Sequence, residues 1–208
     1  VRRATRPGDR DLLRRQRLDE VGATLSALEV EDLVTVRDVL LVTQRLEMVR
    51  RMTSEIDEYV VELGADGRLL DLQLQEVVTG VGSDQVLLLR DYLPDSDGYE
   101  STIAVLDEAE DAALVDLLQL GQLMALASDL EGLDRPLSPR GYRLLGRVPR
   151  LPEPVVQRLI EHFGSLQKLL AASIDDLQSV DGVGEARARS VRDALSRLAE
   201  SSILDRYQ

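Results

Sequence analysis

The chain has 208 residues, of which 44% are hydrophobic and 30% charged, with no cysteine, no tryptophan and one phenylalanine. This composition excludes disulfide bonds and thiolate metal sites, and no apolar run approaches the roughly 20 residues that span a bilayer. Because the cores must be built from Leu, Val, Ile and Ala, the composition favours packed helices. We therefore expect an all-α protein of the cytoplasm, with neither a membrane segment nor a signal peptide.

The net charge of −13, taken alone, argues against binding to nucleic acid, but the charge is unevenly distributed. Residues 1–17 carry seven Arg against two Asp, and residues 18–136 carry seven basic against 27 acidic residues. Residues 137–208 carry eleven basic against nine acidic residues. This change predicts a boundary near residue 136. An acidic field fades over about 8 Å at physiological salt, so a tail held away from it can still meet phosphate.

The Arg-rich residues 1–17 are interrupted by Pro7-Gly8, which is expected to break a helix, and helical spacing begins at Leu18. Two interpretations are open for this segment. It is either a basic arm that touches nucleic acid or an exposed lead-in at the end of an excised piece. The first residue, Val1 in place of Met, favours the second.

A long helix is predicted after Thr35-x-x-Asp38, which is typical of an N-terminal cap. It should run for about 28 residues and end at Gly64. A helix of this length with one apolar stripe needs neighbouring helices or a second copy of the chain. The stripe consists of residues spaced by three, four or seven: Val39, Val42, Leu46, Val49, Ile56, Val60 and Leu63.

Shorter elements follow. Residues 69–78 are expected to form a short helix, and residues 79–84 (TGVGSD) a Gly-rich loop. That loop lacks a preceding strand and a nearby Lys, so it is not a phosphate-binding loop. Residues 85–93 are an apolar run compatible with a helix or a strand. Helical spacing returns at 101–127, and residues 128–139, with two Pro and one Gly, are the predicted linker to the tail.

Residues 177–195 (LQSVDGVGEARARSVRDAL) carry the pattern most informative about function. Gly182 and Gly184 allow a tight hairpin whose bare amides stand at a helix N-terminus, where they favour a phosphate. Val183 should anchor the hairpin inward, and the small Ala188 lets two helices pack closely. We identify a helix-hairpin-helix motif rather than a turn that merely joins two helices.

The candidate DNA-binding residues belong to this hairpin, to the helix after it, and to an upstream copy. The three arginines of the following helix could reach flanking phosphates, whereas Glu185 should repel phosphate mildly. The full candidate set is Gly182, Val183, Gly184, Glu185, Arg187, Arg189, Arg192, Arg147 and Arg150.

The upstream copy, at residues 144–164, follows the same plan in degraded form. Arg150 and Pro152 stand where glycines are expected, and because Pro has no N–H this copy should bind phosphate less well through its backbone. Two hairpins related by a pseudo-two-fold axis could meet both strands across one minor groove. His162 is expected to be a partly buried packing residue. The sequence offers no catalytic constellation and no metal site.

This tandem resembles the double helix-hairpin-helix domains of the excision nuclease UvrC and the Holliday-junction protein RuvA. With the spacer included, residues 18–207 resemble the family of the bacterial DNA-integrity scanning protein DisA. In that family an N-terminal diadenylate cyclase domain uses ATP with Mg or Mn to make cyclic di-AMP, and branched DNA on the tail suppresses it. The matching segments are EDLVTVRDVLLVTQRLEMVRRM, VVELGADGRLLDLQL, LSPRGYRLLGRVPRLPEPVV, HFGSLQKLLAAS and LQSVDGVGEARARSVRDALSRLAESSILDRY.

The catalytic Asp-Gly-Ala and Arg-His-Arg motifs of that family are missing here. We therefore expect a regulatory part with no enzyme activity and no cofactor of its own. It would comprise a basic lead-in at 1–17, an acidic helical linker domain at 18–136 and a tandem helix-hairpin-helix DNA-binding domain at 137–208. The expected partners are branched DNA and further copies of the protein, joined through the linker or the missing cyclase domain. The alternative is a fragment for oligomerisation and protein docking that binds little DNA.

Overall fold

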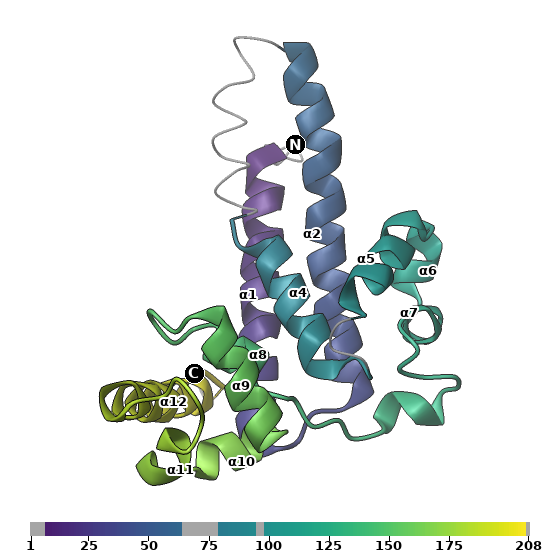
Figure 1. Cartoon of the computed structure of the whole chain (residues 1–208). Coiled ribbons are helices and arrows are strands. Elements are labelled where there is room, and N and C mark those ends of the chain that lie inside the picture. The colour runs from purple at the N-terminus through teal and green to yellow at the C-terminus, as the bar shows by residue number, and fades with distance from the viewer. Residues whose placement is uncertain (1–6, 64–78, 95–97, 207–208) are drawn as a thin grey trace.

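A computed structural model describes residues 7–63, 79–94 and 98–206 as helices joined by turns and loops (Figure 1). Within these ranges the β-type pairing is limited to one isolated antiparallel bridge between Thr35 and Pro136. The all-α prediction is therefore confirmed. The helices are, in chain order, α1 (Pro7–Glu31), α2 (Val36–Leu63), α4 (Val81–Tyr92), α5 (Tyr99–Glu108), α6 (Asp111–Val115), α7 (Leu117–Leu123), the 3₁₀ helix η2 (Glu131–Asp134), α8 (Tyr142–Leu145), α9 (Glu153–Phe163), α10 (Leu166–Ala171), α11 (Ile174–Gln178) and α12 (Glu185–Arg206).

Helix α2 begins where its sequence predicts. The amide and the hydroxyl of Thr35 both donate to Asp38 Oδ2, at 2.9 and 2.6 Å, so the predicted N-terminal cap is confirmed. Its apolar stripe is buried from Val39 to Val49 and packs against α1, α4 and α7 of the same chain. The predicted stop at Gly64 lies outside the described residues. Neighbouring helices thus cover the part of the stripe that the structure describes.

Two expectations for the N-terminal half are wrong. Pro7-Gly8 does not break a helix, because α1 starts at Pro7. The fixed φ and missing N–H of proline suit the first helical turn. Similarly, the Gly-rich segment is a loop only at its start: Gly80 adopts a left-handed φ of +88°, and Val81 begins α4. The ambiguous apolar run is helical within α4. The short helix expected at 69–78 lies outside the described residues.

The second half of the linker region is more broken than its helical spacing predicts. Three short helices, α5, α6 and α7, replace one continuous run. Asp116 interrupts the run by capping α7, where its side chain accepts the amides of Leu118 and Gln119. The predicted linker at 128–139 contains η2 and is tied to the start of α2. There the Val36 amide donates to Arg135 O at 3.0 Å, and the Leu137 amide to Val34 O at 2.9 Å.

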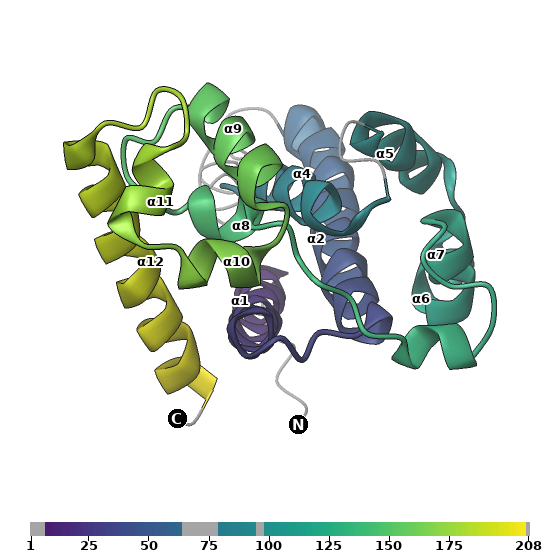
Figure 2. The same ribbon diagram turned by 60° about the horizontal axis from the view of Figure 1, so that its bottom comes forward.

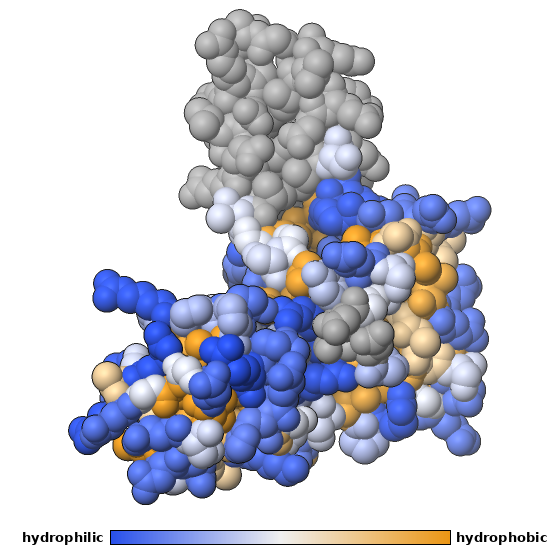
Figure 3. Space-filling model, viewed as in Figure 1, coloured by the Kyte–Doolittle hydropathy of each residue, from blue (hydrophilic) through white to orange (hydrophobic). Residues whose placement is uncertain are grey.

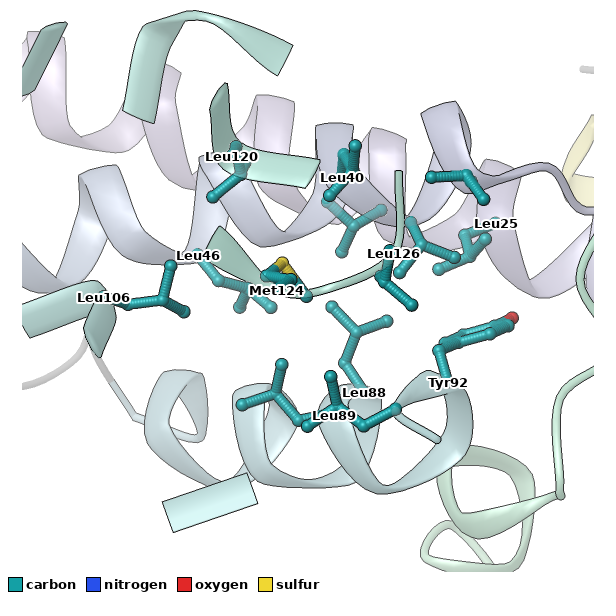
Figure 4. Packing of buried hydrophobic residues seen from close by; sticks show 14 of the residues in the cluster. Leu25, Leu40, Leu46, Leu88, Leu89, Tyr92, Leu106, Leu120, Met124 and Leu126 are labelled. Carbon is teal, nitrogen blue, oxygen red and sulfur yellow. The ribbon is translucent and has the colours of Figure 1, made fainter. Parts of the chain in front are cut away.

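Buried hydrophobic side chains form two clusters, one within residues 18–133 and the other within residues 142–195. The first holds α1, α2, α4 and the short helices together, and Figure 4 shows Leu25, Leu40, Leu88 and Met124 pointing into it. The second lies within α8 to α12. Its fully or nearly fully buried members are Tyr142, Leu144, Leu145, Val148, Val155, Val156, Leu159, Ile160, Leu166, Leu169, Ala172, Leu177, Val180, Val183, Ala188, Val191, Ala194 and Leu195.

The two clusters adjoin each other. Helix α1 packs against both α2 and α12, and α4 packs against α8 (Figure 2). Leu87 of α4 is a partly buried side chain that contacts the second cluster. Residues 137–208 are therefore held against the linker region by helix–helix contacts as well as by the chain itself.

Asp91, at the end of α4, caps the first helix of the tail. Its Oδ1 accepts the amides of Gly141 and Tyr142, at 2.6 and 2.7 Å, and its Oδ2 accepts the amide of Arg143 at 2.9 Å. A carboxyl group at a helix N-terminus satisfies amides that have no intrahelical acceptor. Burial, followed by the negative charge of Glu29, raises the pKa of Asp91 to about 7, against the three amides that lower it.

A buried ion pair lies beside this cap. Glu29 of α1 is 2% exposed and accepts Arg143 Nη1 of α8 at 2.5 Å. The Tyr92 hydroxyl of α4 donates to the same carboxylate oxygen at 2.7 Å. Breaking such a pair from one side leaves a buried charge uncompensated, which is strongly destabilising. Three helices from both halves of the molecule therefore meet at one carboxylate.

Replacing Asp91 by Asn should destabilise the chain by about 1–3 kcal/mol, because the Asn amide group cannot accept the N–H that Oδ2 accepts. The measurement is thermal or denaturant unfolding of the full chain. Asp193→Asn, at an exposed position of α12, is the control with the same change of side chain.

The same pair of proteins should differ in their response to pH. An unfolded Asp has a pKa of about 3.9, so the folded parent keeps a proton that the unfolded chain has lost between about pH 4 and pH 7. This stabilisation is full below pH 4 and is lost as the pH rises through 7. The stability advantage of the parent over Asp91→Asn should therefore shrink across that window, and a constant advantage would contradict the assignment.

Candidate nucleic-acid interface

The second hairpin joins α11 to α12 and has a left-handed residue at its centre. Helix α11 starts with a capping box between Ser173 and Asp176. The chain turns at Gly182, whose φ is +79°, and the Val183 amide then donates to Val180 O at 3.0 Å. Val183 is 4% exposed, so it anchors the hairpin in the core as its sequence pattern predicts.

The hairpin leads directly into the N-terminus of a long helix. The amide of Ala188 donates to Gly184 O at 2.9 Å and makes the first such bond of α12. The amides of residues 184–187 consequently have no intrahelical acceptor, and they lie at the positive end of the helix dipole. Gly184, Glu185 and Arg187 are all exposed. This arrangement suits a bound anion such as a phosphate.

Two arginines hold the carbonyl groups of the turn. Arg158, on α9, donates from Nε to Asp181 O at 2.8 Å. Arg187 donates from Nη1 to Gly182 O. A Cβ placed on Gly182 would lie 2.6 Å from Nη2 of Arg158, so a side chain there would push the flexible guanidinium away from the turn, while the positive φ favours glycine. Gly184 has no such constraint, because no atom lies within 4 Å of its ideal Cβ.

The first hairpin has the same backbone plan, 32 residues earlier. Arg150 stands where Gly182 does in the second hairpin, and its φ of +59° is also left-handed. Val148 corresponds to Val180, and both are 5% exposed. The predicted degenerate copy is therefore a real structural repeat, with Arg150 in a conformation that costs a non-glycine residue about 1–2 kcal/mol.

The two hairpins differ in the amides that they present. In the first, Pro152 and Pro154 have no N–H, and the Val155 amide donates to Pro152 O at 2.8 Å. Among residues 152–155, only the amide of Glu153 therefore remains without a backbone acceptor in this turn. The second hairpin presents four such residues. Both hairpins lie toward the same end of the tail (Figure 2), but the second is far better equipped for a phosphate.

The predicted arginines fall into different environments. Arg187 is exposed beside the amides of the second hairpin. Arg189 is exposed but forms an ion pair with Glu185 at 2.5 Å, which offsets the charge expected to repel phosphate. Arg192 is partly buried and donates to Leu170 O at 2.5 Å, at the end of α10, so the structure gives it a structural contact.

Arg147 and Arg150 do not share one environment either. Arg147 is exposed and lines a cavity of about 510 Å³ between α1, α2, α4, α8 and α12, together with Asp84 and Arg143. Partial loss of hydration there, followed by the charge of Arg143, lowers the pKa of Arg147. Arg150 is exposed as well, at the tip of the first hairpin. His162, expected to be partly buried, is instead exposed and contacts the Phe163 ring edge-on at 4.8 Å.

Sequence reasoning missed Arg158. Its partner, the Asp181 carbonyl, is 23 residues away and belongs to the other repeat. No local pattern distinguishes it from any arginine on the outer face of an amphipathic helix. Among the described residues, no group of His, Cys, Asp and Glu is placed to hold a metal ion. None of the helices described there is both long and apolar enough to cross a bilayer.

An all-α fold that ends in two successive hairpins of this geometry defines a helix-hairpin-helix protein. Residues 148–204 match the helix-hairpin-helix motif family, and residues 14–132 match the family described as the DisA bacterial checkpoint controller linker region. Because the second of these matches covers more than half of the chain, the chain belongs to the DisA family.

Curated relatives extend the likeness across both segments. The DNA integrity scanning protein DisA of Streptomyces coelicolor is 61% identical over 196 residues, which cover 92% of this chain and 52% of the relative. The corresponding proteins of Frankia alni and Kineococcus radiotolerans are each 60% identical, covering 92% and 93% of this chain and 54% and 55% of theirs. The chain thus spans about half the length of the curated relatives that it matches.

Gly182→Ala should destabilise the tail by about 1–2 kcal/mol, because it introduces left-handed strain and displaces the Arg158 guanidinium from the turn. Gly184→Ala is the matched control at the next glycine, where the space is open. Unfolding of the two variants should be compared under the same conditions. Equal stability of both would show that the turn does not depend on Gly182.

Proposed function

We propose that this chain binds DNA through phosphate contacts at the second hairpin, with little reading of base sequence. The single observation that carries the proposal is the group of amides at residues 184–187 at the exposed start of a 22-residue helix. Backbone amides and arginines contact phosphates, which every sequence presents alike. Arg187 stands at this position, and Arg189 can join it by leaving Glu185. The names of the curated relatives, as DNA integrity scanning proteins, agree with such a ligand.

The proposal extends to the form of the DNA and to regulation. Two hairpins on one rigid tail would together select branched DNA, with Arg150 as the contact of the first hairpin. Binding would regulate a diadenylate cyclase domain elsewhere in the longer protein, in the cytoplasm, and this chain would need no cofactor of its own. The division into a lead-in at 1–17, a linker at 18–136 and a tail at 137–208 belongs to the same proposal, as does homo-oligomerisation.

A second candidate is a docking or oligomerisation element that binds little DNA. Hydrophobic side chains gather on the surface over α5, α6 and α7 (Figure 3), where Val105 and Val115 are 42% and 60% exposed. By contrast, the loop between α8 and α9 projects from the tail as a hydrophilic surface. The apolar surface lies on the linker region, so it can coexist with DNA binding by the tail.

Gly184→Pro should weaken DNA binding about tenfold, since it deletes one amide donor from the anion site. The first repeat shows that the turn tolerates this residue, because Pro152 occupies the corresponding position in a folded hairpin. Arg187→Glu should weaken binding as well and reduce the salt dependence by about one phosphate contact. The measurement is a mobility shift on junction and linear DNA at two salt concentrations.

Two variants control for side effects. Gly184→Ala keeps the amide, and Arg197→Glu makes the same charge change further along α12. Both should bind nearly as the parent does. If Gly184→Pro and Arg187→Glu also bind as the parent does, the second hairpin is not the contact, and the docking function gains support.

Incubation of the pure chain with ATP and Mg²⁺ or Mn²⁺ should yield no cyclic di-AMP, because both nucleotide-binding motifs of the cyclase family are missing from its sequence. Product analysis by chromatography, beside an active diadenylate cyclase as positive control, checks this expectation. Turnover that survives repurification would refute it.

A further inference from the structure

Arg158 belongs to the first repeat but serves the second hairpin. It lies on α9, the helix that follows the first hairpin, and its Nε donates to Asp181 O at 2.8 Å. Its side chain is partly buried, with the guanidinium against Gly182, where Nη2 would lie 2.6 Å from a Cβ. The group therefore covers one side of the turn while holding the carbonyl on which the turn begins.

The first repeat makes this contact to the second hairpin, but among the described residues the second repeat makes no equivalent contact to the first. The residue 32 positions after Arg158 is Ser190, which is exposed on α12 and too short to make the reciprocal contact. Meanwhile, the first hairpin has prolines in place of amide donors at two positions. The first repeat has thus lost most of its own donors and contributes a guanidinium to its neighbour.

Charge gives a reason for an arginine at this point. The second hairpin carries two exposed carboxylates, Asp181 and Glu185, on either side of the amides. Glu185 is paired with Arg189 at 2.5 Å. On the other side, Arg158 brings a positive charge to the backbone of Asp181. A hydrogen bond from a charged donor is about twice as strong as a neutral one, so it can hold an exposed turn in a single conformation.

We propose that Arg158 is a positioning residue, which holds the second hairpin in the conformation that presents its amides to an anion. This inference rests on the proposed binding of phosphate by that hairpin. The first repeat then acts mainly as a support for the second, and the two copies form one binding unit of unequal parts.

The test combines structure and binding in the full chain. Arg158→Ala should shift the backbone ¹⁵N–¹H resonances of Gly182, Gly184 and Glu185 in the absence of DNA. It should also weaken binding to junction DNA about tenfold, the effect of losing one charge-assisted hydrogen bond. Arg158→Lys keeps a charged donor and should recover most of both properties. Arg197→Ala removes the same charge from α12 and should change neither.

A double-mutant cycle tests the contact itself. The destabilisation by Gly182→Ala should be smaller when Arg158 is already Ala, since no guanidinium then has to be displaced from the turn and no hydrogen bond to Asp181 O is lost. Additive effects would overturn the contact, and this readout stands even if Arg158→Ala folds poorly, because Arg158→Lys can replace it in the cycle.

Each remaining outcome decides between the two proposals. Weakened binding with unshifted hairpin resonances would mean that Arg158 touches DNA directly, which overturns the positioning role. Unchanged resonances and unchanged affinity would overturn it as well. If the parent binds no DNA, the proposed function fails, whereas the resonances and the cycle still establish or overturn the hold of Arg158 on the hairpin.

Discussion

The fold depends on two buried carboxyl groups where the linker region meets the tail. Asp91 accepts three amides at the start of α8, and Glu29 accepts both Arg143 and Tyr92. Each group has lost its hydration and is compensated by donors from another part of the chain, so neither half can move away without leaving a buried polar group unpaired. Helix α1, which carries Glu29, also packs against α12. Together they determine the direction in which both hairpins face.

The two hairpins of the tail share a backbone conformation but differ in the groups that they expose. Arg150 and Gly182 share a left-handed turn, and the valines before them share their burial. The repeats diverge in the residues that follow, where prolines in one copy replace amide donors in the other. A pair of equal hairpins would meet two phosphates in the same way. Here the free amide donors are concentrated at the second hairpin, while the first repeat supplies the Arg158 side chain that holds it.

Local signals were readable in the sequence, and contacts between distant segments were not. The cap at Thr35, the length of α2 and the turn at Gly182 follow from local sequence patterns, and the sequence predicts them correctly. The prediction at Pro7 is wrong because proline can either break a helix or start one. The carboxyl groups of Glu29 and Asp91 resemble the many exposed acids around them, since their partners lie 50 or more residues away. The contact of Arg158 with Asp181 O cannot be predicted from local sequence for the same reason.

Helix α1 couples the stability of the linker region to that of the tail. It contributes to the first hydrophobic cluster through Leu18 and Leu25 and also packs along α12, which carries the second. Loosening α1 would open the first cluster and remove the packing of α1 against α12 at once, which favours cooperative unfolding of the linker region and the tail. If the hairpins bind DNA as proposed, the binding energy would then be linked by mass action to the stability of α2. A ligand bound to the tail would then lower the population of locally unfolded states in the linker region, without any change in its folded structure.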